Sequence, residues 1–144
     1  MKNLKMEWVL IFFVLMCYSC RQESALQKTP ELTGSWKLVS IVESDKNISV
    51  KNSENPEKVA GMIFREKGEL EAMTPANYIT GYYETGQQNT IQIAGGGTQR
   101  SDTPWGEVFV NALPAIDHYE LKANELTLYY HNSNKLVFTR VLNL

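Results

Sequence analysis

The stretch IDHYELKANELTLYYHNSNKLVFTRVL, residues 116–142, decides the fold class of this chain. Apolar and polar residues alternate over 116–121, 125–130 and 135–142, and short polar segments separate the three runs. Because successive side chains of a strand point to opposite faces, this alternation predicts three antiparallel strands with one buried face. The residues expected to point inward are Tyr119, Leu121, Leu126, Leu128, Tyr130, Leu136 and Phe138.

Strand signals continue upstream of this stretch. β-Branched and aromatic residues are enriched over 32–42, and turn residues divide 59–65 from 69–73 and 77–84 from 89–94, which predicts a first strand and two hairpins. The polar segment 45–58 reads as a long loop with a short strand at 48–50. About eight short strands in series favour a mainly β (α+β) fold: a curled antiparallel sheet or a partly open, lipocalin-like barrel.

One short helix interrupts the strands. Thr103 can cap it, Pro104 suits the first helical position, and Pro114 should end it. Apolar residues recur at helical spacing, which predicts a face that packs on the sheet: Trp105, Val108, Phe109, Ala112 and Leu113. The preceding Gly95-Gly96-Gly97-Thr98 lacks the lysine of a phosphate-binding loop and is interpreted as a flexible connector.

The first residues have the pattern of an export signal. Lys2 and Lys5 precede an uncharged apolar block that is too short to span a membrane comfortably. Ser19-Cys20 resembles the lipobox of bacterial lipoproteins, in which the cysteine becomes the lipidated N-terminus. We therefore predict a signal peptide over 1–19, lipid attachment at Cys20, a flexible tether over 20–31 and one domain over 32–144. An ordinary secretory signal cut nearby and an uncleaved signal anchor remain alternatives.

Composition limits the chemistry of the domain. The only two cysteines, Cys17 and Cys20, lie in the export segment, so the domain has no internal disulfide, thiolate metal site or cysteine nucleophile. The net charge of −2 and only 14 lysines and arginines give no basic stretch for nucleic acid. We expect a monomer that contacts the membrane through its lipid.

No catalytic or metal-binding pattern is found. His118 and His131 have no partners at zinc-ligand spacing, and adjacent Asp117 and His118 should point to opposite faces of a strand. No nucleophile elbow is found, and three glutamates near one predicted turn, Glu66, Glu69 and Glu71, are interpreted as solvent-exposed. We therefore expect no enzymatic activity, no catalytic residue, no metal and no cofactor.

Aromatic residues offer an alternative role. A cup for a small apolar or sugar-like ligand could be formed by Trp36, Tyr78, Tyr82, Tyr83, Trp105, Tyr119, Tyr129 and Tyr130, although core packing accounts for most of them. Trp36, Asn77 and Tyr82 are the candidate ligand-binding residues.

Several landmarks resemble the META/HslJ-like domain over residues 32–141. They are LTGSWKL at 32–38, Phe109-x-x-Ala112-Leu113, Tyr119-x-Leu121 and Leu126-x-Leu128. Asn77 with Gly81 and Tyr82, and Thr98-x-Arg100, are similar to stretches of that family next to its two cysteines, where this chain has Ala76 and Ser101 or a neighbour. The chain lacks that optional bridge, which is expected to lower its stability by about 2–4 kcal/mol.

The resemblance implies a role in the bacterial cell envelope, in stress tolerance, and no catalytic residues. Together with Cys20, it favours a non-enzymatic, lipid-anchored protein that binds or scaffolds envelope proteins. Arg21 is not the aspartate that retains some lipoproteins in the inner membrane, so the outer membrane is expected. The alternative function is a lipocalin-like carrier of a small hydrophobic ligand, which requires an open apolar cavity.

Overall fold

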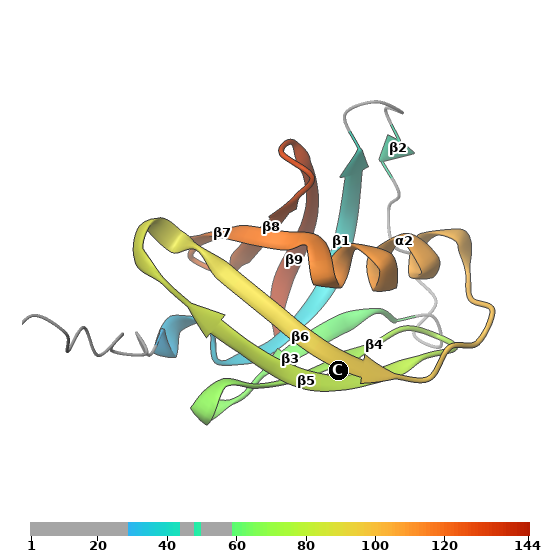
Figure 1. Cartoon of the computed structure of the whole chain (residues 1–144), viewed down its shortest axis with the longest axis horizontal. Coiled ribbons are helices and arrows are strands. Elements are labelled where there is room, and N and C mark those ends of the chain that lie inside the picture. The colour runs from blue at the N-terminus through green and yellow to red at the C-terminus, as the bar shows by residue number, and fades with distance from the viewer. Residues whose placement is uncertain (1–28, 44–47, 50–58) are drawn as a thin grey trace, which may run out of the picture.

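The computed structural model describes residues 29–43, 48–49 and 59–144 (Figure 1). The signal peptide, Cys20 and most of the predicted tether lie outside these residues. In chain order the elements are η1 (Pro30–Leu32), β1 (Gly34–Glu43), β2 (Ile48–Ser49), β3 (Gly61–Phe64), η3 (Glu66–Gly68), β4 (Glu69–Met73), β5 (Tyr78–Thr85), η4 (Gln87–Asn89), β6 (Ile91–Gly97), α2 (Pro104–Ala112), η5 (Leu113–Ala115), β7 (Ile116–Lys122), β8 (Glu125–Tyr130) and β9 (Asn134–Val141).

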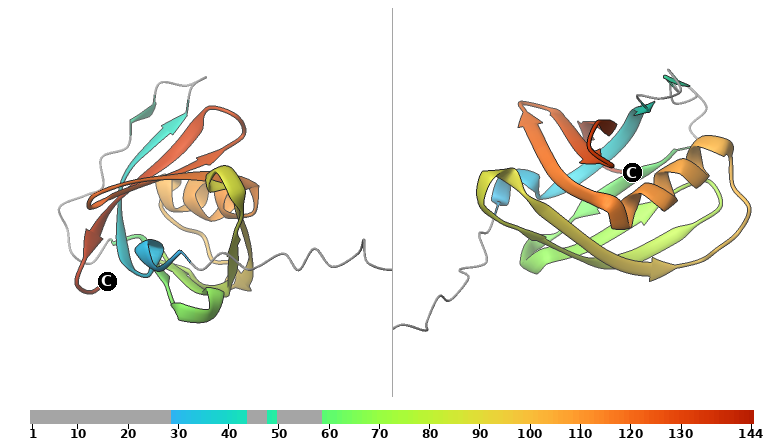
Figure 2. Two further views of the ribbon diagram at one scale, coloured as in Figure 1. Left: turned by 90° about the vertical axis from the view of Figure 1, so that its left-hand side faces the viewer. Right: turned by 45° about the horizontal axis from the view of Figure 1, so that its top comes forward.

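All strands form one antiparallel sheet, in the order β6-β5-β4-β3-β1-β9-β8-β7, with β2 paired to β1. Strand β1 is central because it pairs with both β3 and β9, and its register with β9 shifts between Leu38 and Ser40. The sheet curls until its two outer strands approach, and the bridge between Thr90 and His118 joins them at one point. The predicted fold class, a curled sheet or partly open barrel with one short helix, is confirmed (Figures 1 and 2).

The glycine-rich segment was predicted wrongly. Gly95, Gly96 and Gly97 are not a connector but the last part of β6, where they pair with Gly81, Thr80 and Ile79. A side chain on Gly97 would collide with the backbone oxygen of Tyr78. The glycines therefore allow β6 to lie close to β5 instead of loosening the chain.

Both ends of the curl are occupied. Helix α2 covers one end of the curl (Figure 2). It buries Phe109, whose ring meets that of Phe138 edge to face with the ring centroids 6.0 Å apart. The other end holds η1, where Leu32 is fully buried and its carbonyl accepts a hydrogen bond from the Trp36 indole N–H at 2.7 Å. Two residues assigned to the tether by the sequence, Pro30 and Glu31, are thus part of the folded domain.

Large side chains fill the interior between these two ends. Those with almost no exposed surface are Trp36, Phe64, Phe109, Phe138, Leu32, Leu38, Met62, Ile91, Leu126, Leu128 and Leu136. Of the seven residues predicted to point inward, six are buried and Leu121 is half-buried against the core. Such packing argues against the carrier alternative, because a lipocalin-like ligand needs the space that these side chains occupy.

Tyr130 is the exception in this core. Its hydroxyl is buried and has no hydrogen-bond partner among the described residues. Burial, with a smaller contribution from the charge of Glu43, raises the pKa of Tyr130 to about 12. Tyr130 therefore loses the hydration of its hydroxyl on folding without a compensating hydrogen bond from the described part of the chain.

Replacing Tyr130 with phenylalanine is expected to raise the free energy of unfolding by about 1 kcal/mol, because it removes an unsatisfied buried group. The raised pKa also means that Tyr130 ionises first in the unfolded state, so wild-type stability should fall from about pH 10 upward. Urea denaturation at pH 7 and pH 11 measures both effects. A less stable Tyr130→Phe protein at pH 7 would show that the hydroxyl has a partner.

Candidate functional site

The three candidate ligand-binding residues lie in three different environments. Trp36 is fully buried in the core, Asn77 is 7 % exposed within a polar cluster, and Tyr82 is 66 % exposed on the outer face of β5. The fold therefore does not bring them together as one ligand site. Two separate groupings are found instead, one around Asn77 and one around Tyr82.

Asn77 is the centre of the first grouping, here called the polar clasp: Thr74, Asn77, Thr98, Arg100 and Asp102. Its side-chain oxygen accepts hydrogen bonds from the Arg100 backbone N–H at 2.7 Å and the Thr98 hydroxyl at 3.1 Å. Its amide donates to the Arg100 carbonyl and to Asp102 Oδ2, both at 2.9 Å. The clasp thereby fastens the β4–β5 turn to the loop between β6 and α2.

Asp102 connects the clasp to the start of α2. Its Oδ2 also accepts from the Thr74 hydroxyl, and its Oδ1 accepts from the Thr103 backbone N–H at 2.7 Å. Thr103 in turn caps α2 by accepting from the Gly106 N–H at 3.1 Å, as predicted. Gly106 is required here, because a β-carbon would lie 2.5 Å from Asp102 Oδ1.

The clasp lowers the pKa of Asp102. Burial alone would raise the pKa of this carboxyl, but hydrogen bonds from Thr74, the Thr103 backbone and Asn77 outweigh it and hold the pKa below its ordinary 3.8. All of these donors stabilise the ionised form. Asp102 is therefore a carboxylate at neutral pH, and both of its oxygens accept hydrogen bonds within the clasp.

Asp102 should make the domain sensitive to acid. A carboxylate with a lowered folded pKa contributes stability that is complete above its unfolded pKa and is lost as the pH falls through the folded value. Asp102→Asn is expected to be about 1–3 kcal/mol less stable than wild type at pH 7. The difference should narrow below about pH 4, measured by urea unfolding from pH 7 to pH 3. A constant difference over this range would contradict the assignment.

The clasp lies where the family resemblance implies a disulfide that this chain does not have. Ala76 precedes Asn77 in the β4–β5 turn, and Ser101 lies between Arg100 and Asp102. These are the two segments that the hydrogen bonds of Asn77 join. In this chain hydrogen bonds therefore make the link for which the resemblance implies a covalent bridge.

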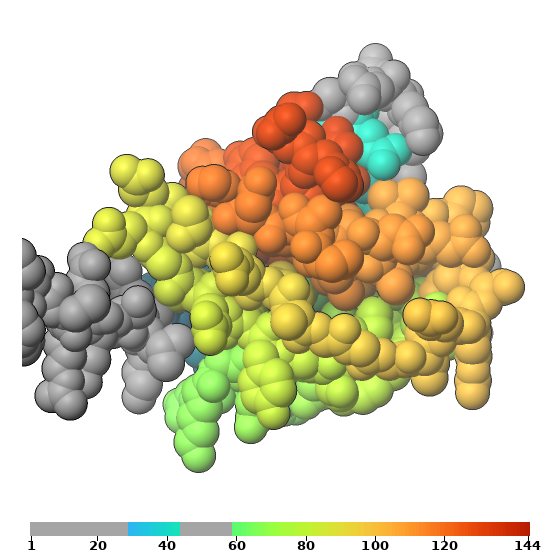
Figure 3. All heavy atoms as spheres, viewed as in Figure 1, coloured from blue at the N-terminus to red at the C-terminus, as the bar shows by residue number. Residues whose placement is uncertain are grey.

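The second grouping, here called the tyrosine face, is on the outer surface of β5 and its neighbours. Tyr78 and Tyr82, at 46 % and 66 % exposure, are the large aromatic side chains most open to solvent in the described chain. Cross-strand pairs place Glu69 and Ala94 on either side of Tyr82, and Glu71 and Gly96 on either side of Thr80. Atoms of β5 and β6 form part of the surface that faces the viewer in Figure 3.

Hydrogen bonds fix one end of the tyrosine face. The Tyr78 hydroxyl donates to Glu71 Oε2 at 2.8 Å, and Arg65 Nε donates to Glu71 Oε1 at 2.6 Å. The bond from Arg65, followed by that from Tyr78, lowers the pKa of Glu71, and the bond to Glu71 raises the pKa of Tyr78. Glu71 is thus a positioning group for Tyr78 and was wrongly interpreted as only solvent-exposed.

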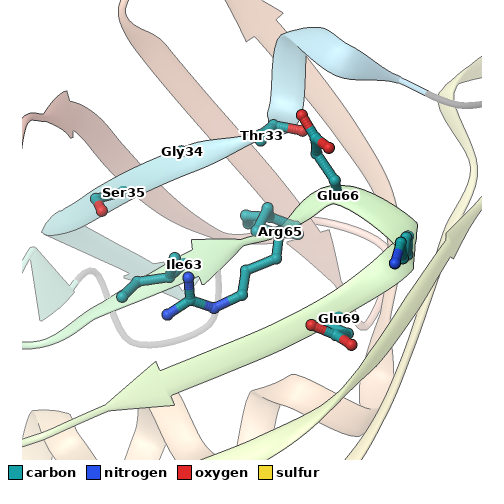
Figure 4. Close-up of a pocket in the computed structure, with 9 residues that line it drawn as sticks. Thr33, Gly34, Ser35, Ile63, Arg65, Glu66 and Glu69 are labelled. Atoms are coloured by element: carbon teal, nitrogen blue, oxygen red, sulfur yellow. The ribbon is translucent and has the colours of Figure 1, made fainter.

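Two hollows lie on the outside of the domain. One of about 510 Å³ is lined by Thr33, Gly34, Ser35, Ile63, Phe64, Arg65, Glu66, Lys67 and Glu69, where Arg65 and three charged neighbours are exposed (Figure 4). The other, of about 290 Å³, is lined by clasp residues such as Arg100 and by their neighbours Pro75 and Tyr78. Both are open and partly polar, unlike the enclosed apolar pockets that hold hydrophobic ligands.

The side chains of Asp117 and His118 are close together, contrary to the prediction from the sequence. Asp117 Oδ1 and His118 Nδ1 lie 3.0 Å apart, although adjacent strand residues were expected on opposite faces. The register of β7 with β8 shifts between Ile116 and His118, and this bulge turns the two side chains toward each other. Both side chains remain more than half exposed. Within the described residues, no cluster of three or more potential ligands could hold a metal ion.

Fold and site together define a class: a small, curled β-sheet domain with a filled interior, an end covered by one helix, and its exposed aromatics on the outer sheet surface. The META domain model matches residues 29–142, and the chain belongs to the META domain family. No curated protein matches the chain.

Solved structures share the fold. A DUF4847 family protein from Bacteroides vulgatus ATCC 8482 has 18 % identity and a TM-score of 0.59, with 78 % of this chain and 96 % of that chain covered. A protein from Burkholderia xenovorans, solved by NMR, has 20 % identity and a TM-score of 0.63, with 85 % and 92 % covered. In the described part of the chain, no helix is long and apolar enough to cross a membrane.

Proposed function

We propose that this META domain protein is a non-enzymatic, lipid-anchored component of the bacterial cell envelope that binds a partner through the tyrosine face. The observation that carries the proposal is the exposure of Tyr78 and Tyr82 on a regular strand of an otherwise well-packed domain. Aromatic side chains held on a rigid element are typical binding anchors, because little side-chain entropy is lost when they are covered.

The position of η1 bears on how a lipid would tether the domain. The described chain begins at the η1 end of the curl, and eight residues, 21–28, separate Cys20 from Thr29. A lipid on Cys20 would therefore hold the η1 end within a tether's length of the membrane, about 15 Å for a flexible coil of eight residues, without fixing the orientation of the domain. The tyrosine face lies on the side between the two ends, where a neighbouring envelope protein could reach it.

The arrangement of titratable groups supports a binding role over catalysis. Both oxygens of Glu71 and both oxygens of Asp102 already accept hydrogen bonds from neighbouring side chains or backbone. These carboxylates are held in their ionised form and are not free to exchange a proton with a substrate. A role in stress tolerance is the one implied by the family resemblance.

Acyl labelling tests the anchor. Cells supplied with an alkyne-tagged fatty acid should label the wild-type protein and Cys17→Ala, whereas Cys20→Ala should lose the label. Loss of label from Cys17→Ala alone, or label on Cys20→Ala, would contradict lipid attachment at Cys20. Separation of inner from outer membranes then tests the outer-membrane location, which is expected because residue 21 is arginine and not the aspartate that retains some lipoproteins in the inner membrane.

Site-specific crosslinking tests the binding face. A benzoylphenylalanine at position 82 should form a discrete crosslinked product in intact cells, and the same group at position 132, in the exposed β8–β9 turn, serves as the control. Because Tyr82 is largely exposed, Tyr82→Ala should change the free energy of unfolding by less than about 0.5 kcal/mol. Equal crosslinking at positions 82 and 132 would argue against the tyrosine face.

A further inference from the structure

The exposed edge of β6 is a second feature beside the tyrosine face. Strand β6 is at the end of the sheet order (Figure 1). Its backbone bridge to β7 is at Thr90, before the strand begins, and part of β6 also lies close to β7 and η5. From Ala94 to Gly97 every residue is exposed, and the whole strand, IQIAGGG, carries no charge and no proline. Natural proteins usually protect such an edge with charges, proline or a bulge, so this edge is open to strand addition.

Backbone direction identifies the groups available at this edge. The Thr98 N–H donates to the Tyr78 carbonyl at 3.1 Å, and the pairing of β5 with β6 continues without a register shift. Since the direction of backbone groups alternates along an antiparallel pair, those of Ile93, Gly95 and Gly97 point away from β5. The two glycines have no side chain that could shield these groups.

The outer surface beside this edge favours a long side chain. On this surface β6 presents only the small residues Ala94 and Gly96, which pair with Tyr82 and Thr80 of β5. A β-carbon on Gly96 would meet nothing within 4 Å. An added strand would lie about two strand spacings, roughly 9–10 Å, from β5. A lysine or arginine of that strand can therefore extend over Ala94 and reach the ring of Tyr82.

Charge determines which side chain fits. Tyr82 has Glu69 beside it on β4 and Glu84 two residues further along the same face of β5. Neither glutamate has an ion-pair partner within the described ranges. A cation over the tyrosine ring would be attracted by the ring and by both carboxylates.

We propose that the edge of β6 from Ile93 to Gly97 binds an extended segment of a partner protein as an added strand, and that a lysine or arginine of this segment lies on Tyr82 between Glu69 and Glu84. This inference rests on the proposed function and names the kind of partner that the tyrosine face binds. Backbone pairing supplies the attachment, and the basic residue supplies the selectivity.

Synthetic peptides test strand addition with the full-length chain in detergent. The probe is a fluorescein-labelled octapeptide of alternating valine and threonine with one central lysine. Two further versions carry N-methyl groups on alternate amides, one set on the odd positions and one on the even. Because only one set of amides can face β6, one methylated peptide should bind about tenfold or more weaker than the other. No binding of the parent peptide, or equal binding of both methylated versions, would overturn strand addition.

The basic residue is tested separately. The lysine peptide should bind about five- to tenfold more tightly than a peptide with glutamate at the same position, and Tyr82→Ala and Glu84→Gln should each reduce this ratio. Glu125→Gln, on the exposed surface of β8, is the matched control and should leave the ratio unchanged. Equal binding of the lysine and glutamate peptides would overturn the role of the cation.

A second copy of the chain is the competing occupant of the edge. Concentration-dependent dimers in which the amides of Ile93–Gly97 lose solvent exchange would overturn the proposal in favour of self-pairing. The outcomes also separate this inference from the proposed function. Crosslinking at position 82 without peptide binding would support the envelope role and contradict strand addition. Peptide binding without labelling of Cys20 would support strand addition and contradict the lipid anchor.

Discussion

Trp36→Ala is expected to lower the free energy of unfolding by about 3–5 kcal/mol, the largest effect of any single change proposed for this domain. Trp36 has no exposed surface and joins β1 to the end of the curl occupied by η1. The substitution would leave a cavity, remove the donor to the Leu32 carbonyl at 2.7 Å, and remove the ring over which the Arg140 guanidinium lies at 4.2 Å. Urea denaturation followed by far-UV circular dichroism measures the loss.

Trp36→Phe separates the two contributions of this residue. Phenylalanine keeps most of the apolar volume but lacks the indole N–H, so the loss should fall to about 1–3 kcal/mol. If Trp36→Ala were instead within 1 kcal/mol of wild type, Trp36 would not be a core residue. The earlier hypothesis that it lines a ligand cup would then return.

The strands were predictable because each carries its own local signal. Alternation of apolar and polar residues within β7, β8 and β9 identifies the face that packs on the core, and this pattern needs no knowledge of the rest of the chain, although Thr127 on the other face of β8 is buried as well. Thr103 and Pro104 mark the beginning of α2 for the same reason. Elements that depend on neighbouring residues of the sequence are therefore predictable from the sequence alone.

The errors arose where a second strand or a distant residue determines the outcome. Gly95–Gly97 has the composition of a loop, and only the close approach of β5 explains why these glycines form a strand. Asp117 and His118 meet because of a bulge that depends on the register with β8. Neither the strand pairing nor the bulge leaves a mark in the composition of the segment itself.

The candidate site was predicted only in part. The sequence singled out Asn77 and Tyr82 individually but not their surroundings, since Asn77 meets Asp102 across 25 positions of the chain. Asp102 was missed entirely, although an aspartate directly before a Thr-Pro helix start is a signal that could have found it. Trp36, the third candidate, reads the same way in sequence whether it faces a ligand or the core.

Asn77→Ala is the second large expected effect, with a loss of about 2–4 kcal/mol. All four hydrogen bonds of the side chain disappear, and the Arg100 backbone and Asp102 lose partners in a site where Asn77 itself is 7 % exposed. Asp102 also accepts a hydrogen bond from the backbone N–H of Thr103, the N-cap residue of α2. The beginning of α2 should therefore loosen together with the β4–β5 turn. Thermal and urea unfolding measure the stability, and hydrogen exchange of the α2 amides reports the helix.

Asn111→Ala is the matched control, because Asn111 is an exposed asparagine within α2 and its loss should lower the free energy of unfolding by less than about 0.5 kcal/mol.

A second experiment tests whether the clasp stabilises the domain in the way that a disulfide would. Cysteines at positions 76 and 101, introduced into Asn77→Ala and oxidised, should recover about 2–4 kcal/mol, since a disulfide there joins the same two segments. If the oxidised protein gained nothing over its reduced form, the hydrogen bonds of Asn77 would have a role that fastening the two segments does not explain.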